Sequence, residues 1–449
     1  MSHPHTHRAN EIVCSSIERR PNRTFARRGC CALGIALLGA TLFCNAGWAN
    51  ESISIKLADG TEVPTTVHSA NGNNLILWLL MGYGPEPGET HLATELAHAG
   101  VEVWQPRLLE ARWLPELDSS FAQVPAEDVA QLIDRAHRDT GKSVYLLGAS
   151  RAAMLALRGT QVWQAQHPQG TVLAGAVLLH PNLFLGPPAP GKDAVYHELA
   201  RQTRLPIFII QPTLSPWYWS VAQTQAVLES GGSKVYVRTV PNTRSRFYSR
   251  SDATEQEERE AKSLPHYLRQ AIAELTQMQL PTRSPTATTG SHPAQPASGK
   301  RGLNPYTADP TPPTLLLPDL EGHMHDLGDY RGRVVLVNFW ASWCPPCVRE
   351  MPSLQRLKDR LLGRPFAILA VNMAEDSHTV RTFLRDKVRA DFTVLLDGDG
   401  EALKRWKVFV FPTSFVIGSD GRIRYGAYGE LPWDEEPAIG VIQSLLPKN

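Results

Sequence analysis

The chain has 449 residues, 45 Lys and Arg against 44 Asp and Glu, a net charge of +1 and a hydrophobic fraction of 42%. This composition is ordinary for globular protein, and the length suits two or three domains, because single cores rarely exceed roughly 250–300 residues. The even charge excludes a nucleic-acid binder that relies on overall basicity, so no nucleic-acid partner is expected.

Residues 1–49 have the order of an export signal. Basic residues between Arg19 and Arg28 precede an apolar run from Cys30 to Phe43, and small residues follow up to Ala49. This order is typical of a secretory signal, and the apolar run is short for a membrane span of about 20 residues. We expect cleavage after Ala49, with an uncleaved membrane anchor as the alternative. The mature protein is then expected in the periplasm or another extracytoplasmic space, where disulfides persist, with membrane contact only through a retained anchor.

The positions of the six cysteines indicate their use. Four lie in the first 44 residues, at Cys14, Cys30, Cys31 and Cys44. If the signal is removed, the mature chain keeps one pair, Cys344 and Cys347. That pattern predicts neither a disulfide scaffold nor a four-cysteine metal site.

Residues 50–280 alternate apolar runs with helical patterns. The expected strands are Leu75–Met81, Val101–Trp104, Ser143–Leu147, Val172–Leu179, Ile207–Ile210 and Val235–Val240, and the expected helices are Ala126–Thr140, Ser150–Leu157, Val221–Leu228 and Glu255–Met278. Apolar strands alternating with helices indicate a mostly parallel sheet that is covered on both faces. The fold class predicted for this block is therefore α/β.

A strand-to-helix turn in this block carries a motif. Residues 146–152 read LLGASRA, which resembles the nucleophile elbow of α/β-hydrolases, G-x-S-x-G, with Ala152 in place of the last glycine. The glycines at 82–84 stand where such folds place the oxyanion loop. This resemblance covers roughly residues 51–278, and it implies an α/β-hydrolase-like domain with Ser150 as the nucleophile.

The other catalytic groups of that family are not visible. The acid would follow the strand before last, where QPTLSP at 211–216 holds no carboxylate, and the histidine would follow the last strand, where PNTRSRF at 241–247 holds none. His180 is a conceivable substitute, and His266 lies in a charged helical stretch. Because a catalytic serine needs a base and an orienting acid, two interpretations stay open. Ser150 is either a vestige in a domain that binds a ligand or partner, or the nucleophile of an active esterase in a bifunctional protein.

Residues 281–307 are rich in Pro, Ser and Thr, which predicts a solvated linker. The block at 308–449 again alternates strands and helices. Its expected strands are Val334–Phe339, Phe366–Val371, Ser414–Ile417 and Ile423–Tyr428, and its expected helices are Cys347–Leu362, Ser377–Lys387 and Trp433–Leu446.

The strongest chemical signal is Cys-Pro-Pro-Cys at residues 344–347, between a buried strand and a helix. The amides and the positive dipole end of a helix N-terminus favour a thiolate at the first sulfur. The second sulfur, one turn on, can resolve a mixed disulfide. We therefore assign Cys344 as nucleophile and Cys347 as resolving thiol. A structural disulfide and half a zinc site are the alternatives, but zinc needs about four ligands and no second cysteine pair remains.

Residues 308–445 resemble the TlpA/ResA branch of the thioredoxin superfamily. The matching text is YRGR at 330–333, VVLVNFW at 334–340, ASWCPPC at 341–347, VREMP at 348–352 and VFPTSF at 410–415. The resemblance implies a thioredoxin-like fold and an exported thiol-disulfide oxidoreductase. It also implies reduction of protein disulfides, including those of apocytochromes in cytochrome c maturation, with electrons from a membrane thiol donor.

The resemblance assigns three further roles. Pro412 falls at the family's cis-proline, and Glu350 matches the acid that can exchange protons with the buried thiol. Asn338 stands where thioredoxin itself has a buried acid, which leaves Glu350 as the proton carrier. No cofactor is expected beyond the redox-active Cys344–Cys347 disulfide.

Overall fold

The computed structural model describes residues 51–278, 302–388 and 390–447. The expected export signal, four of the six cysteines and most of the expected linker lie outside the described residues. Within these ranges, no helix combines the length and the apolar character needed to cross a membrane.

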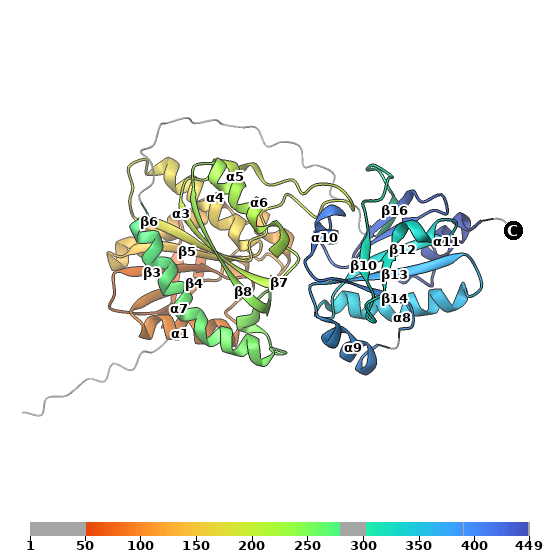
Figure 1. Cartoon of the computed structure of the whole chain (residues 1–449). Coiled ribbons are helices and arrows are strands. Elements are labelled where there is room, and N and C mark those ends of the chain that lie inside the picture. Colours follow the sequence, from red (N-terminus) through yellow and green to blue (C-terminus); the bar gives the residue numbers. More distant parts are fainter. Residues whose placement is uncertain (1–50, 279–301, 389, 448–449) are drawn as a thin grey trace, which may run out of the picture. The chain divides into compact units, whose positions relative to one another are not determined.

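Residues 51–278 build one eight-stranded sheet with the order β1-β2-β4-β3-β5-β6-β7-β8 (Figure 1). Its strands are β1 Glu51–Lys56, β2 Glu62–His68, β3 Asn74–Leu79, β4 Val101–Pro106, β5 Ser143–Ala149, β6 Leu173–Leu179, β7 Pro206–Leu214 and β8 Lys234–Arg244. β2 pairs antiparallel with β1 and β4, and all other pairs are parallel. The predicted mostly parallel α/β sheet is therefore present, with two unpredicted strands at its antiparallel edge.

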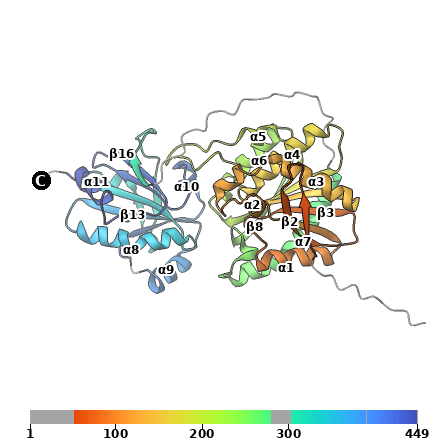
Figure 2. The ribbon, with the colours of Figure 1, turned by 180° about the vertical axis from the view of Figure 1, so that it is seen from behind.

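Helices cover both faces of this sheet (Figures 1 and 2). They are α1 Pro87–His98, α2 Leu108–Ala111, α3 Ala126–Thr140, α4 Ala152–Gln166, α5 Glu198–Gln202, α6 Val221–Ser230 and α7 Glu255–Gln277. The buried side chains of α1 and α7 join one apolar cluster, and those of α3, α4 and α6 join another. Burial on both faces explains why the central strands read as unbroken apolar runs.

Residues 302–447 build a six-stranded sheet with the order β14-β13-β12-β15-β16-β9. Its strands are β9 Gly302–Pro305, β12 Val334–Trp340, β13 Phe366–Met373, β14 Thr393–Asp397, β15 Thr413–Ile417 and β16 Ile423–Tyr428, and a separate hairpin joins β10 Leu316–Pro318 to β11 Met324–Asp326. β12, β13 and β14 are parallel, whereas β15, β16 and β9 add antiparallel pairs. This sheet begins at Gly302, inside the segment expected as linker (281–307). The prediction missed β9 because it is a short edge strand in a stretch that contains Pro and Gly.

Four helices complete this part of the chain, namely α8 Pro345–Arg360, α9 Ser377–Asp386, α10 Glu401–Arg405 and α11 Ala438–Leu445. Leu354 and Leu357 of α8, Val380 of α9 and Ile442 of α11 are buried in the same core as the central strand β12. This packing fixes the N-terminus of α8 at the carboxyl end of β12, where the dithiol lies.

Candidate active site

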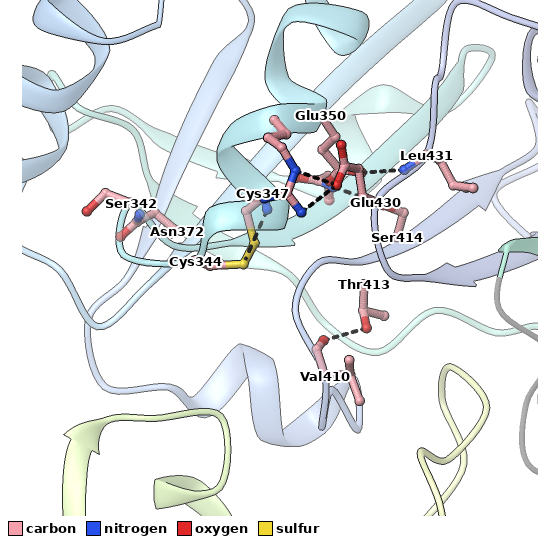
Figure 3. The surroundings of a disulfide bond; sticks show 12 residues. Ser342, Cys344, Cys347, Glu350, Asn372, Val410, Thr413, Ser414, Glu430 and Leu431 are labelled. Carbon is pink, nitrogen blue, oxygen red and sulfur yellow. Dashed lines mark hydrogen bonds and ion pairs between the residues drawn. A yellow bond between two sulfur atoms is a disulfide. The ribbon is translucent and has the colours of Figure 1, made fainter. Parts of the chain in front are cut away.

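Cys344 and Cys347 lie at the junction of β12 and α8. The Cys344 N–H donates to the Ala341 carbonyl at 3.2 Å, so residues 341–344 turn the chain from strand to helix. Pro345 is the first helical residue, where its missing N–H costs nothing. The two cysteines form a disulfide with Cα atoms 5.3 Å apart, and the Cys347 N–H donates to Cys344 Sγ at 3.3 Å (Figure 3). This amide would equally stabilise a thiolate at Cys344.

Glu350 lies on α8 one turn beyond Cys347 and is 2% exposed. Its Oε2 accepts from the Leu431 N–H at 3.3 Å (Figure 3). The same oxygen accepts from Trp433 Nε1 at 3.3 Å, and Oε1 accepts from Asn338 Nδ2 at 2.7 Å. Burial raises the pKa of Glu350 to about 8, although these three donors oppose the shift. A carboxyl group with this pKa can hold and release a proton near neutral pH.

Asn338 connects Glu350 to the neighbouring strand. It lies on β12, is fully buried, and its Nδ2 also donates to Ser414 Oγ of β15 at 2.9 Å. The Asn338 Oδ1 atom has no hydrogen-bond partner within the described part of the chain. Since Asn338 cannot carry a proton at neutral pH, Glu350 is the titratable group of this buried set.

The loop before β15 lies beside the dithiol. The Phe411–Pro412 peptide bond is cis, and the Phe411 ring meets the Trp343 ring edge to face with centroids 5.9 Å apart. Thr413 Oγ1 donates to the Val410 carbonyl at 2.7 Å and closes this loop. The structure therefore brings together Cys344, Cys347, Glu350 and Pro412, the four residues that the sequence singled out.

One carboxylate at this site was not predicted. Glu375 follows β13, and its Oε2 accepts from the Ser342 N–H at 2.7 Å. A signal was available, because β12 and β13 are parallel neighbours and their carboxyl ends meet at one edge of the sheet. Among the described residues, no group of three His, Cys, Asp or Glu side chains could hold a metal ion.

Ser150 lies at the turn between β5 and α4 and has the geometry of an elbow. Its φ is 47°, in the left-handed region that a non-glycine residue seldom adopts. The Ser150 N–H donates to the Leu179 carbonyl at 3.1 Å, and its carbonyl accepts from the Asn182 N–H at 3.0 Å. These bonds hold the strained backbone between two strand ends. Strain of this kind often marks a functional site.

No described side chain activates Ser150. His180, the conceivable substitute base, follows β6 and is 2% exposed, and neither of its ring nitrogens has a hydrogen-bond partner among the residues that the structure describes. Burial, and then the nearby Arg246, lower the pKa of His180 to about 3, so the ring is neutral at physiological pH. Gln211 stands where a hydrolase would have the acid that orients its histidine, and the Gln211 amide donates to the Pro212 carbonyl at 3.0 Å. His266 is exposed on α7.

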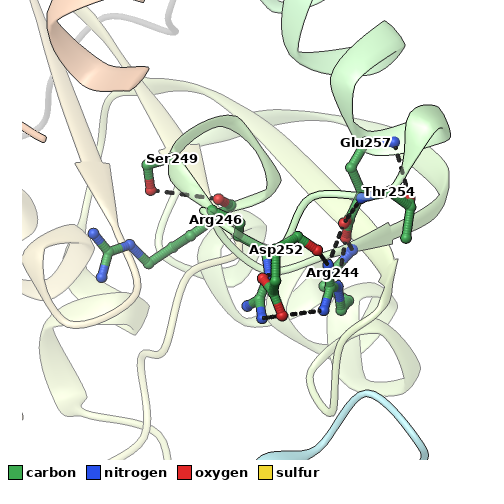
Figure 4. Close-up of polar contacts among 7 residues, drawn as sticks. Arg244, Arg246, Ser249, Asp252, Thr254 and Glu257 are labelled. Carbon is green, nitrogen blue, oxygen red and sulfur yellow. Dashed lines mark hydrogen bonds and ion pairs between the residues drawn. The ribbon is translucent and has the colours of Figure 1, made fainter. Parts of the chain in front are cut away.

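An ion pair occupies the segment that would carry a hydrolase histidine. Arg244, the last residue of β8, donates through Nε to Glu257 Oε1 at 2.7 Å and through Nη1 to Asp252 Oδ2 at 3.0 Å (Figure 4). Glu257 is 1% exposed and also caps α7, because its Oε2 accepts from the Thr254 N–H at 2.9 Å. Hydrogen bonding to Arg244 lowers the pKa of Glu257 despite burial. These contacts hold the N-terminus of α7 against the end of β8.

Comparisons with known proteins identify relatives of the C-terminal part. The Redoxin family matches residues 306–442. The thiol-disulfide oxidoreductase ResA of Geobacillus kaustophilus is 38% identical over 114 residues, which are 25% of this chain and 65% of that protein. ResA of Bacillus thuringiensis is 35% identical over 118 residues, which are 26% of this chain and 68% of that protein. The crystal structure of StoA from Bacillus subtilis matches with 27% identity and a TM-score of 0.25, over 27% of this chain and 92% of that one. The chain thus spans slightly less than two thirds of the first of these relatives.

Proposed function

Because the chain belongs, through its C-terminal part, to the family of ResA thiol-disulfide oxidoreductases, we propose that it reduces disulfides of protein substrates with the Cys344–Cys347 pair. The observation that carries this proposal is the dithiol at the N-terminus of α8 above the buried Glu350. The Cys344 thiolate attacks a substrate sulfur and expels the other substrate sulfur as a thiolate. Cys347, once deprotonated, attacks Cys344 Sγ, releases the second substrate thiol and leaves the Cys344–Cys347 disulfide.

Each turnover moves two electrons to the substrate, so an external dithiol must regenerate the enzyme. A membrane thiol donor on the outer side of the cytoplasmic membrane fits the export signal proposed for residues 1–49. In this role Glu350 takes the Cys347 proton, and the loop at Pro412 offers backbone to a substrate strand. Disulfides of apocytochromes, formed before haem attachment, are the substrate class that the resemblance to the TlpA/ResA branch suggests.

For residues 51–278 we propose an α/β-hydrolase-like domain that binds a ligand or partner without hydrolysing it. The strand order, the antiparallel β2 and the positive φ of Ser150 support the hydrolase-like assignment. The unpartnered, neutral His180 and the ion pair at Arg244 argue against catalysis. A bifunctional protein with an active serine esterase is the second candidate, and the strained elbow favours it.

An insulin reduction assay with a dithiol as electron source tests the redox proposal. The chain should accelerate insulin precipitation, and Cys344→Ser should reduce the rate to the level of the dithiol alone, because the attacking thiolate is lost. Cys347→Ser should accumulate a mixed disulfide with insulin, since no second thiol resolves it. Full activity of Cys344→Ser would show that the nucleophile is assigned wrongly.

A further inference from the structure

Glu375 binds the turn that carries Cys344 with both of its oxygens. Oε2 accepts from the Ser342 N–H at 2.7 Å and from Asn372 Nδ2 at 2.8 Å, and Oε1 accepts from Ser342 Oγ. Three donors on one carboxyl group are the partners of an ionised carboxylate, which only accepts hydrogen bonds. Asn372 is fully buried on β13, so it fixes Glu375 to the sheet rather than to solvent.

This carboxylate is bonded to a residue of the turn that leads into the nucleophilic Cys344. Ser342 is two residues before Cys344 within the turn that the Cys344 N–H closes onto Ala341, and Figure 3 shows Ser342 and Asn372 beside the disulfide. The positive end of α8 favours a thiolate at Cys344. A fixed negative charge at the preceding turn acts in the opposite sense.

Resting on the proposed function, we infer that Glu375 is a positioning residue that holds the 341–344 turn and limits the thiolate fraction of reduced Cys344. Stabilising the thiolates of a reduced dithiol makes the couple more oxidising. A negative charge that destabilises one of these thiolates therefore makes the couple more reducing. Glu375 therefore biases the dithiol toward donating electrons. Glu350 lies three residues after Cys347 on α8, and it acts on the proton of Cys347 rather than on Cys344.

Alkylation of the reduced full chain with iodoacetamide, in a Cys347→Ser background, measures the thiolate fraction of Cys344. Glu375→Gln keeps the size and one acceptor oxygen but loses the charge. It should raise the alkylation rate at pH 7 by about two- to tenfold, where tenfold corresponds to one pKa unit. Glu375→Asp keeps the charge and should stay within about twofold of the parent. Glu321→Gln, which removes an exposed charge paired with Arg381, is the matched control and should leave the rate unchanged.

The same variants, with Cys347 restored, are equilibrated against glutathione. Glu375→Gln should shift the couple toward the oxidising side relative to the parent and to Glu321→Gln. An unchanged rate and potential in Glu375→Gln, or changes equal to those in Glu321→Gln, would overturn the inference. If the parent shows no reversible dithiol couple at all, the proposed function fails, and that result is distinct from the failure of Glu375 alone.

Discussion

At the scale of single residues, the site contains two acids in different surroundings, the buried Glu350 and the partly exposed Glu375. Glu350 is held away from water among neutral donors, so its neutral form is favoured. Glu375, at the other end of the dithiol segment, receives three hydrogen bonds suited to the ionised form. The dithiol must change its protonation state during turnover. Glu350 can take up a proton at this site, whereas Glu375 places a carboxylate at the turn, so the two acids have complementary roles.

Glu350 should make stability depend on pH. The pKa of Glu350 is raised in the folded chain to about 8 by burial, with Glu430 acting in the same direction, from an ordinary value of 4.5. The unfolded chain therefore releases this proton first, and the stability that Glu350 contributes is present below about pH 4.5 and is lost as the pH rises toward 8. The free energy of unfolding should fall by up to about 1.4 kcal/mol per pH unit across that window.

Urea unfolding of the disulfide form at several pH values measures this slope. Glu350→Gln, which is neutral at every pH, should flatten it by the contribution of one group. Equal slopes in the parent and in Glu350→Gln between pH 5 and 8 would mean that the carboxyl group titrates normally.

At the scale of elements, the segment from β8 to α7 is held by one buried pair. The Arg244 side chain is 11% exposed and that of Glu257 is 1% exposed. Arg244→Ala would leave the Glu257 charge buried without its partner, which costs about 3–5 kcal/mol in comparable pairs. We expect the free energy of unfolding of the N-terminal part to fall by about 3 kcal/mol.

Arg250→Ala is the matched control, because Arg250 pairs with Asp252, which is 63% exposed. Its effect should stay below about 1 kcal/mol. Denaturant titration followed by circular dichroism compares the two variants. Equal effects would contradict the structural role assigned to the Arg244–Glu257 pair.

The sequence predicted most of the inner strands, and β16 from the hairpin turn before it, but it missed strands at sheet edges, including the mostly apolar β14. The buried strands from β3 to β8 and β12, β13 and β15 were expected, with ends shifted by a few residues. β1 and β2 alternate polar and apolar residues at a sheet edge, and β9 lies in a Pro- and Gly-containing stretch. Such edge strands depend on their partners, which a local pattern does not show.

The same distinction applies to the site. Cys344, Cys347, Glu350 and Pro412 were predicted because a short motif or a family resemblance carries each of them. Glu375 is joined to Ser342 only because β13 lies parallel to β12 in a particular register. The expected parallel strands indicated that polar side chains would gather at this sheet edge, but the Glu375–Ser342 contact itself depends on the register.

At the scale of the whole molecule, the chain carries a Redoxin-family part after a larger α/β part. Ser150 keeps the elbow backbone while the described residues offer it no base, so this part should not react as a serine hydrolase. A fluorophosphonate probe should leave the intact chain unlabelled under conditions that label a known serine esterase. Labelling that disappears in Ser150→Ala would instead establish the bifunctional alternative.

The equilibrium potential of the Cys344–Cys347 pair against glutathione shows whether this pair donates or accepts electrons. We expect a value near that of thioredoxin, roughly −270 mV, and Cys344→Ser should abolish the couple. A value near roughly −120 mV, typical of a strong oxidant, would contradict this expectation.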